Sequence, residues 1–117
     1  MKTSITAEVT SKEAPSETIQ SALTHDETSE KLQDVPDWTY HAKTITRTYK
    51  FDGFPKSIEF VDQIAKHAQK LNHHPDIDIR FDQVTLVLTT HDANGLTEND
   101  FVLAEQCDEE FDTLVES

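Results

Sequence analysis

Apolar and polar residues alternate regularly from Trp38 onward, and this alternation predicts where strands lie. Residues 38–40 and 44–51 are rich in β-branched and aromatic residues, which is typical of strands. Residues 41–43 lie between these two runs and are expected to form a turn. By period-two alternation, the core-facing positions of the second strand are Ile45, Tyr49 and Phe51.

A helical repeat replaces the alternation beyond the strand-breaking run at residues 52–55. Ser57 is suited to be the N-cap of a helix, and Asn72 is expected to end the helix shortly before Pro75. The apolar stripe expected along this helix consists of Ile58, Val61, Ile64, Ala65, Ala68 and Leu71. The pattern therefore predicts an amphipathic helix, followed by a loop over residues 72–76.

Alternation returns after this loop and predicts a β-hairpin. The apolar positions of its first strand are Ile77, Ile79 and Phe81, and those of its second strand are Val84, Leu86 and Leu88. A turn is expected at residues 82–83, and residues 92–95 are expected to leave the sheet.

The C-terminal segment has helical periodicity again. Residues 97–100 (TEND) are expected to cap a final helix and to place two acids in its first turn, where they favour the helix dipole. The apolar face of this helix is expected to contain Phe101, Ala104, Cys107, Phe111, Leu114 and Val115.

The N-terminal residues differ in composition from the rest. Residues 1–22 are rich in Ser, Thr and Glu and contain no aromatic residue, so a disordered tail is predicted. Thr24 and Glu27 have the spacing of a capping box, which predicts a short helix within residues 23–32. For the domain over residues 23–117 we predict an α+β fold. Its four-stranded antiparallel sheet would carry two main helices on one face, in the order β-β-α-β-β-α.

Charge and composition narrow the function classes. The 117 residues include 23 acidic and 10 basic ones, giving a formal net charge of −13. A field of that sign repels phosphate backbones and anionic lipid heads, so direct nucleic-acid or membrane binding is not expected. The single cysteine, Cys107, permits no intrachain disulfide, and no apolar run reaches the ~20 residues of a membrane helix. The N-terminal residues lack a secretory signal, and we expect a cytoplasmic protein.

Three of the six histidines occupy informative places. His73 and His74 follow the first long helix, and His91 lies where the last strand ends. Both loops leave elements of one compact sheet, so the three imidazoles are expected to meet at one end of the domain. Imidazole titrates near neutral pH, so such a cluster can both give and take protons. His25, His41 and His67 are interpreted as solvated side chains.

Other site chemistries fit the sequence less well. Three histidines and a carboxylate can hold zinc or iron, but no pair here has the i, i+4 spacing of a zinc-protease helix. The chain has no phosphate-binding glycine loop and no serine in a nucleophile elbow. Cys107 falls on the apolar face of the last predicted helix, which favours a core position over a nucleophile.

One spaced motif is specific enough to suggest a family. His73-His74-Pro75 is followed by Phe81 after five residues, by His91 after nine more and by Asp100 after eight more. This pattern resembles the signature of the pterin-4a-carbinolamine dehydratase family, and the likeness extends over about residues 23–115. One position departs from the family pattern, because Gln69 stands where the family often has glutamate. Glutamine keeps an acceptor oxygen but cannot ionise.

The resemblance implies a lyase that dehydrates a 4a-hydroxytetrahydropterin to a quinonoid dihydropterin, in tetrahydrobiopterin recycling. It implies histidine acid/base catalysis without a metal or a redox cofactor. The implied catalytic residues are His73, His74 and His91. The implied substrate-binding residues are Gln69, Asn72, Thr89, Thr90 and Asp92. Structural roles within the motif are expected for Pro75, which fixes the loop, for Phe81, and for Asp100, whose carboxylate is expected to bond the backbone amide of Thr97.

Two other functions stay open at this stage. The same fold could serve as a non-catalytic dimerisation or assembly cofactor of another protein, as the resemblance also implies. A metalloprotein could use the same histidines. The resemblance further implies a homodimer or homotetramer, with a pterin as the small-molecule ligand and with an aromatic amino-acid hydroxylase among the conceivable protein partners.

Overall fold

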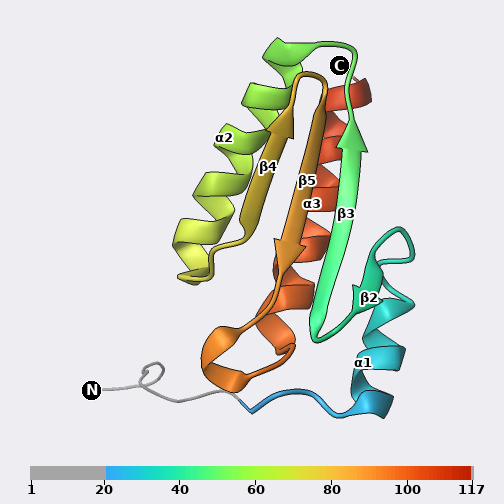
Figure 1. The fold of residues 1–117 in the computed structure, drawn as a ribbon. Helices are drawn as coiled ribbons and strands as arrows, with labels where there is room; N and C mark the ends of the chain where they lie inside the picture. Colours follow the sequence, from blue (N-terminus) through green and yellow to red (C-terminus); the bar gives the residue numbers. More distant parts are fainter. Residues whose placement is uncertain (1–20, 117) are drawn as a thin grey trace.

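The computed structural model describes residues 21–116, so most of the predicted N-terminal tail lies outside the described residues. The chain forms three α-helices, four strands and one 3-10 turn in this part (Figure 1). In chain order they are α1 (His25–Leu32), β2 (Thr39–His41), β3 (Thr44–Lys50), α2 (Phe54–Leu71), β4 (Asp76–Arg80), β5 (Gln83–Leu88), η1 (His91–Ala93) and α3 (Glu98–Glu116). None of the helices in residues 21–116 is both long and apolar enough to cross a bilayer.

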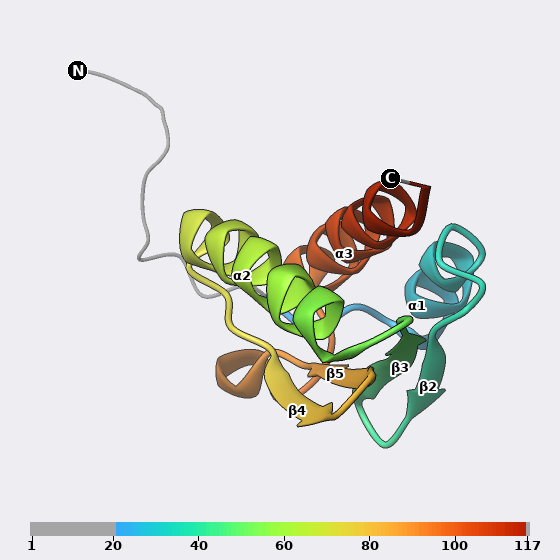
Figure 2. The same ribbon diagram turned by 90° about the horizontal axis from the view of Figure 1, so that it is seen from above.

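The four strands form one antiparallel sheet in the order β2-β3-β5-β4. Figure 2 shows α2 and α3 lying side by side over one face of this sheet, as predicted. The short α1 is also present as predicted. It begins with a complete capping box, in which Thr24 and Glu27 each bond the backbone amide of the other.

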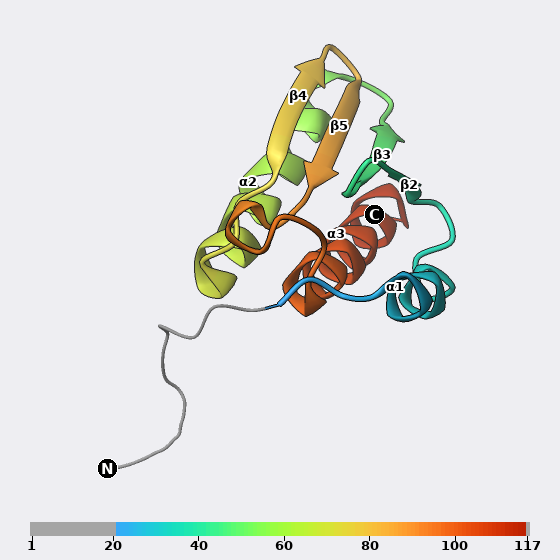
Figure 3. The same cartoon turned by 60° about the horizontal axis from the view of Figure 1, so that its bottom comes forward.

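Three motif-bearing segments meet at one end of the molecule. The helix α2 ends at Asn72, which adopts the left-handed conformation (φ 51°) that closes many helices. The strand β5 runs back toward the same end, and its exit forms η1 before α3 begins (Figure 3). The sheet and the two helices thus hold the two histidine-bearing loops next to each other.

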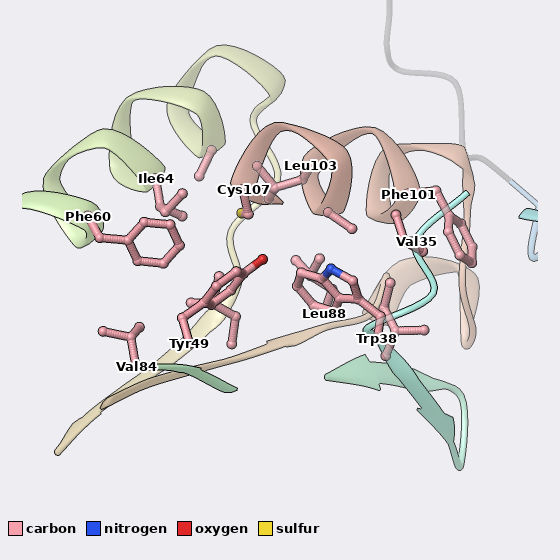
Figure 4. Close-up of a cluster of buried hydrophobic side chains, with 14 of the residues drawn as sticks. Val35, Trp38, Tyr49, Phe60, Ile64, Val84, Leu88, Phe101, Leu103 and Cys107 are labelled. Carbon is pink, nitrogen blue, oxygen red and sulfur yellow. The ribbon is translucent and has the colours of Figure 1, made fainter. Parts of the chain in front are cut away.

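The core lies between the sheet and the two long helices (Figure 4). Aromatic rings from three elements pack against one another, with Tyr49 4.7 Å from Phe60 and 5.0 Å from Phe111 between ring centroids. The predicted inward-facing residues of β3 and β5 are all buried, namely Ile45, Tyr49, Val84, Leu86 and Leu88, together with Phe51 just beyond β3.

The apolar stripe of α2 differs from the prediction. Its buried positions are Ser57, Phe60, Ile64 and Ala68, whereas Ala65 is exposed. The helix also begins before Ser57, because Pro55 occupies its first turn and fixes the backbone there. Ser57 is therefore not the N-cap, and its hydroxyl donates instead to the Gly53 carbonyl at 3.3 Å. Phe60 turns inward because it packs against the aromatic rings of the sheet.

Three smaller predictions are also corrected. The β4–β5 turn is formed by residues 81–82, so Phe81 has a positive φ of 54° and is 69% exposed instead of facing the core. Val115 is 52% exposed near the end of α3, whereas Leu103, which the prediction left out of the apolar face, is fully buried. The first strand is Thr39–His41, so only residues 42–43 form the turn that follows.

Candidate active site

A pocket of about 290 Å³ lies at the end of the molecule where the two histidine-bearing loops meet. Its lining comes from the end of α2, the loop that follows it and the exit of β5. The lining residues are Asn72, His73, His74, Thr89, Thr90, His91 and Asp92. The volume is near the lower end of the range for small-molecule pockets. The structure thus brings the three predicted catalytic histidines together with four of the five predicted substrate-binding residues.

His73 is held by a buried carboxylate from another element. Its Nε2 lies 2.5 Å from Oδ1 of Asp100 in the first turn of α3. The Asp100 side chain is fully buried, and the His73 side chain is only 11% exposed. A carboxylate accepts hydrogen bonds, so this contact places a proton on Nε2. In the neutral ring, Nδ1 is then the nitrogen that can accept a proton.

The second oxygen of Asp100 is also fully engaged. Oδ2 accepts hydrogen bonds from the backbone amide of Thr97 at 2.9 Å and from the hydroxyl of Thr90 at 2.8 Å. The predicted bond to the Thr97 amide is therefore present, but it is one of three. The hydroxyl of Thr97 lies 2.8 Å from that of Thr90. Because the Thr90 hydroxyl donates its own proton to Asp100, it can accept the hydrogen bond from Thr97.

The other two histidines are open to solvent. His74 is exposed, and its Nε2 lies 3.3 Å from Oε1 of Gln69, one turn back on α2. Gln69 does not line the pocket and reaches it only through His74. His91 is exposed in the first position of η1. The pocket therefore combines one oriented, nearly buried imidazole with two accessible ones.

The hairpin turn between β2 and β3 contacts the part of the pocket lining that contains Thr89. The hydroxyl of Thr89 donates to the backbone carbonyl of Lys43 at 2.7 Å, so it is not a free donor to a ligand. Ala42 and Lys43 both have positive φ, 51° and 71°, although neither is glycine. Such consecutive left-handed residues match the twist of a two-residue hairpin.

The remaining motif residues lie outside the pocket lining. Pro75 is half-buried in the loop before β4, and Phe81 lies at the β4–β5 turn, where β5 begins its run toward the pocket. His67 is not simply solvated, because it bridges α2 to α3 through a 2.8 Å contact with Glu110. Cys107 is buried, and burial raises the pKa of its thiol far above the usual range, so it is not a nucleophile.

Across residues 21–116, no group of three or more His, Cys, Asp or Glu side chains is arranged to hold a metal ion. The pocket presents imidazoles, hydroxyls, an amide and one carboxylate, which can bind a polar heterocycle and move protons to and from it.

Sequence reasoning missed two features of this site. It assigned Asp100 to helix capping alone, and it gave no role to the hydroxyl of Thr97. The fixed distance between Asp100 and the histidines of the motif was the available signal for the first. Nothing in the sequence pairs Thr97 with Thr90, because that contact depends on how the β5 exit folds back onto the start of α3.

The family profile and the related sequences all indicate the same protein family. The profile of the family described as pterin 4 alpha carbinolamine dehydratase matches residues 21–110. A protein of Chloroflexus aurantiacus, provisionally named pterin-4-alpha-carbinolamine dehydratase, is 49% identical over 87 residues, which cover 74% of this chain and 94% of the relative. A protein of Nocardia farcinica with the same provisional name is 47% identical over 87 residues, 74% of this chain and 92% of the relative.

Two solved structures are similar as well. The crystal structure of a transcriptional coactivator/pterin dehydratase from Brucella melitensis superposes with a TM-score of 0.74 at 34% identity, covering 76% of this chain and 97% of that one. A pterin dehydratase-like protein described as a RuBisCO assembly factor in the α-carboxysome superposes with a TM-score of 0.54 at 16% identity, over 63% of this chain and 86% of that one. The second likeness concerns the fold alone.

Proposed function

Since this chain belongs to the pterin-4a-carbinolamine dehydratase family, we propose that it dehydrates a 4a-hydroxytetrahydropterin to the quinonoid dihydropterin and water. The observation that carries the proposal is the gathering of His73, His74 and His91 around one pocket, with His73 bonded to the buried Asp100. The proposed enzyme is a 4a-hydroxytetrahydrobiopterin dehydratase.

The reaction needs a base and an acid but no change in oxidation state. The C4a–O bond breaks, the hydroxyl leaves as water after taking up a proton, and N5 loses its proton as the C4a=N5 double bond forms. A base must therefore lie near N5, and an acid must lie near the hydroxyl. General acid–base catalysis of this kind contributes about 10²–10⁴-fold to a rate.

We assign the base to His73 and the acids to His74 and His91. The contact with Asp100 fixes the proton on Nε2 of His73, which leaves Nδ1 as the acceptor for the N5 proton. The same carboxylate stabilises the imidazolium that forms. His74 and His91 are exposed, so they can regain protons from solvent after donating to the hydroxyl. Asn72, Thr90 and Asp92 would supply polar contacts to the pterin ring.

The test is the rate of 4a-carbinolamine breakdown, coupled to a phenylalanine hydroxylase. We expect the protein to accelerate the breakdown, His74→Ala to reduce the acceleration at least about tenfold, and the triple change of His73, His74 and His91 to Gln to abolish it. His25→Ala is the matched control, because His25 is an exposed histidine of α1 outside the pocket. Undiminished turnover in the triple variant, with the fold retained, would rule the proposal out.

A folded protein without activity would direct attention to Gln69 and to protein partners. If Gln69→Glu then restored turnover, the missing carboxylate beside His74 would be the cause. If it did not, the alternative function of a dimerisation or assembly cofactor would be favoured. The name of the Brucella protein, which includes a transcriptional coactivator, supports that alternative.

We also propose that the protein is a homodimer or a homotetramer, which analytical sedimentation would test.

A further inference from the structure

We propose that the chain segment just before α1, residues 22–24, is a positioning element for the loop that carries His91. The segment runs past the start of α3 and the η1 loop at the pocket end of the molecule (Figures 1 and 3). This inference rests on the proposed function, because it concerns the same pocket. No residue of the segment lines that pocket.

The segment contacts the loop from behind through two neighbouring residues. The backbone amide of Leu23 donates to the carbonyl of Leu96 at 2.7 Å, and the Leu23 side chain packs against the core. Ala22 lies so close to Gly95 that a Cβ added at Gly95 would be 3.0 Å from the Ala22 Cβ. Ordinary contacts between carbon atoms are about 3.5–4.0 Å.

Gly95 connects this contact to the catalytic residues. The Gly95 carbonyl accepts from the Thr90 amide at 3.0 Å, and the Gly95 amide donates back to the Thr90 carbonyl at 3.4 Å. Thr90 in turn donates to Asp100, the carboxylate that orients His73. His91 directly follows Thr90 in the chain. A displacement of Gly95 would therefore move His91 and, through Thr90 and Asp100, would also disturb His73.

An ion pair also links α1, which directly follows the segment, to the start of α3. The ammonium of Lys31 lies 2.8 Å from the carboxylate of Glu98 at the start of α3. The segment and α1 therefore contact the chain on either side of Thr97, at Leu96 and at Glu98.

Backbone conformation does not account for glycine at position 95. Its φ is not positive, so the backbone there allows an L residue. A Cβ at this position would instead press against the Cβ of Ala22, so that one of the two residues would have to shift by a few tenths of an ångström. The closeness of these two residues makes the contact testable by paired substitutions.

The experiment is a double-mutant cycle on the full chain. We expect Gly95→Ala to lower kcat about three- to tenfold, with little change in KM, and to shift the His91 Hε1 resonance in the NMR spectrum. Adding Ala22→Gly should remove the clash, restoring kcat to within about twofold and returning the resonance. Ala22→Gly alone should change neither. Rescue of this kind tests coupling between the two sites and not overall stability.

A second variant changes Ala22, the exposed partner in the contact with Gly95. Ala22→Val enlarges the segment at a solvent-exposed position, so the fold should tolerate it even if Gly95→Ala does not fold. We expect the same fall in kcat and the same movement of the His91 resonance. Ser21→Val is the matched control, since Ser21 is the exposed neighbour of Ala22.

The outcomes separate this inference from the proposed function. Wild-type protein without turnover would refute the proposed function, while the His91 resonance would still report the coupling. An unchanged resonance in Gly95→Ala and Ala22→Val, or a change that Ala22→Gly fails to reverse in the double variant, would overturn the positioning role.

Discussion

Asp100 joins three parts of the molecule through one side chain. Its carboxylate accepts from His73 in the pocket, from Thr90 at the exit of β5 and from the backbone amide of Thr97 at the start of α3. A buried carboxylate is stable only when such donors satisfy it. The same carboxylate therefore orients His73 and caps the start of α3.

Replacing Asp100 by Asn tests both uses at once. All three partners are donors, and the amide would turn its NH₂ group toward at least one of them. We expect kcat to fall at least about tenfold, because the proton on His73 is no longer fixed to Nε2. We expect the free energy of unfolding to fall by about 1–3 kcal/mol, because a buried donor loses its acceptor.

Steady-state kinetics and urea unfolding measure the two effects separately. Asp112→Asn is the matched control, because Asp112 is an exposed acid on the same helix. If Asp100→Asn lowered the stability but kept full kcat, Asp100 would be assigned to capping alone.

At the scale of residues, the sequence predicted most of the pocket, because the motif residues are identified by their separations along the chain and not by the fold. His73, His74 and His91 occupy fixed positions in that motif, and the structure brings them together. What each hydroxyl bonds was not predictable. Thr89 donates to a carbonyl 46 positions away in sequence, a contact that exists only once the hairpin turn has closed against β5.

At the scale of elements, the other convergent carboxylate is Asp108, which ties α3 to β3 and to the chain before β2. Oδ1 of Asp108 accepts from Trp38 at 3.0 Å, from Arg47 at 2.7 Å and from Tyr49 at 2.5 Å. The Arg47 guanidinium also lies 4.3 Å from the centre of the Tyr49 ring, within range of a cation–π contact. Burial and the bond to Asp108 raise the pKa of Tyr49 far above its ordinary value.

Removing this acceptor should loosen the helix from the sheet. We expect Asp108→Ala to lower the free energy of unfolding by about 3 kcal/mol, since three donors lose their partner and Arg47 loses its main counter-ion. Denaturant unfolding measures the change, with Asp112→Ala as the control one turn further along α3. A loss no larger than that of Asp112→Ala would show that water replaces the network without cost.

Periodicity predicted the elements better than their faces. The strands β3 and β5 were predicted with the correct inward residues, because alternation leaves only two choices and the polar residues exclude one. On α2, two overlapping stripes both fit helical spacing, one through Ala65 and one through Phe60. Contacts with Tyr49 and Phe51 decide between them, and those contacts are tertiary.

At the scale of the whole molecule, charge is the dominant feature. The formal net charge of −13 is carried by a chain of only 117 residues, and self-repulsion of this kind destabilises the compact state. Exposed ion pairs such as Lys31–Glu98 and Lys50–Asp82 oppose it only weakly, because solvent-exposed pairs contribute about 0–1 kcal/mol.

Salt should therefore stabilise this protein at neutral pH. Sodium chloride shortens the screening length from about 30 Å at 10 mM to about 8 Å at 150 mM, which weakens repulsion across the surface. We expect Tm to rise by about 4 °C or more over that range, corresponding to about 1 kcal/mol for a domain of this size. Thermal unfolding followed by circular dichroism measures the shift. Near the isoelectric point of about 4.6 the net charge vanishes, and the dependence on salt should vanish with it. A Tm that fell with salt at neutral pH would mean that the ion pairs outweigh the repulsion, so that local attraction between the elements and not net charge governs the stability of the fold.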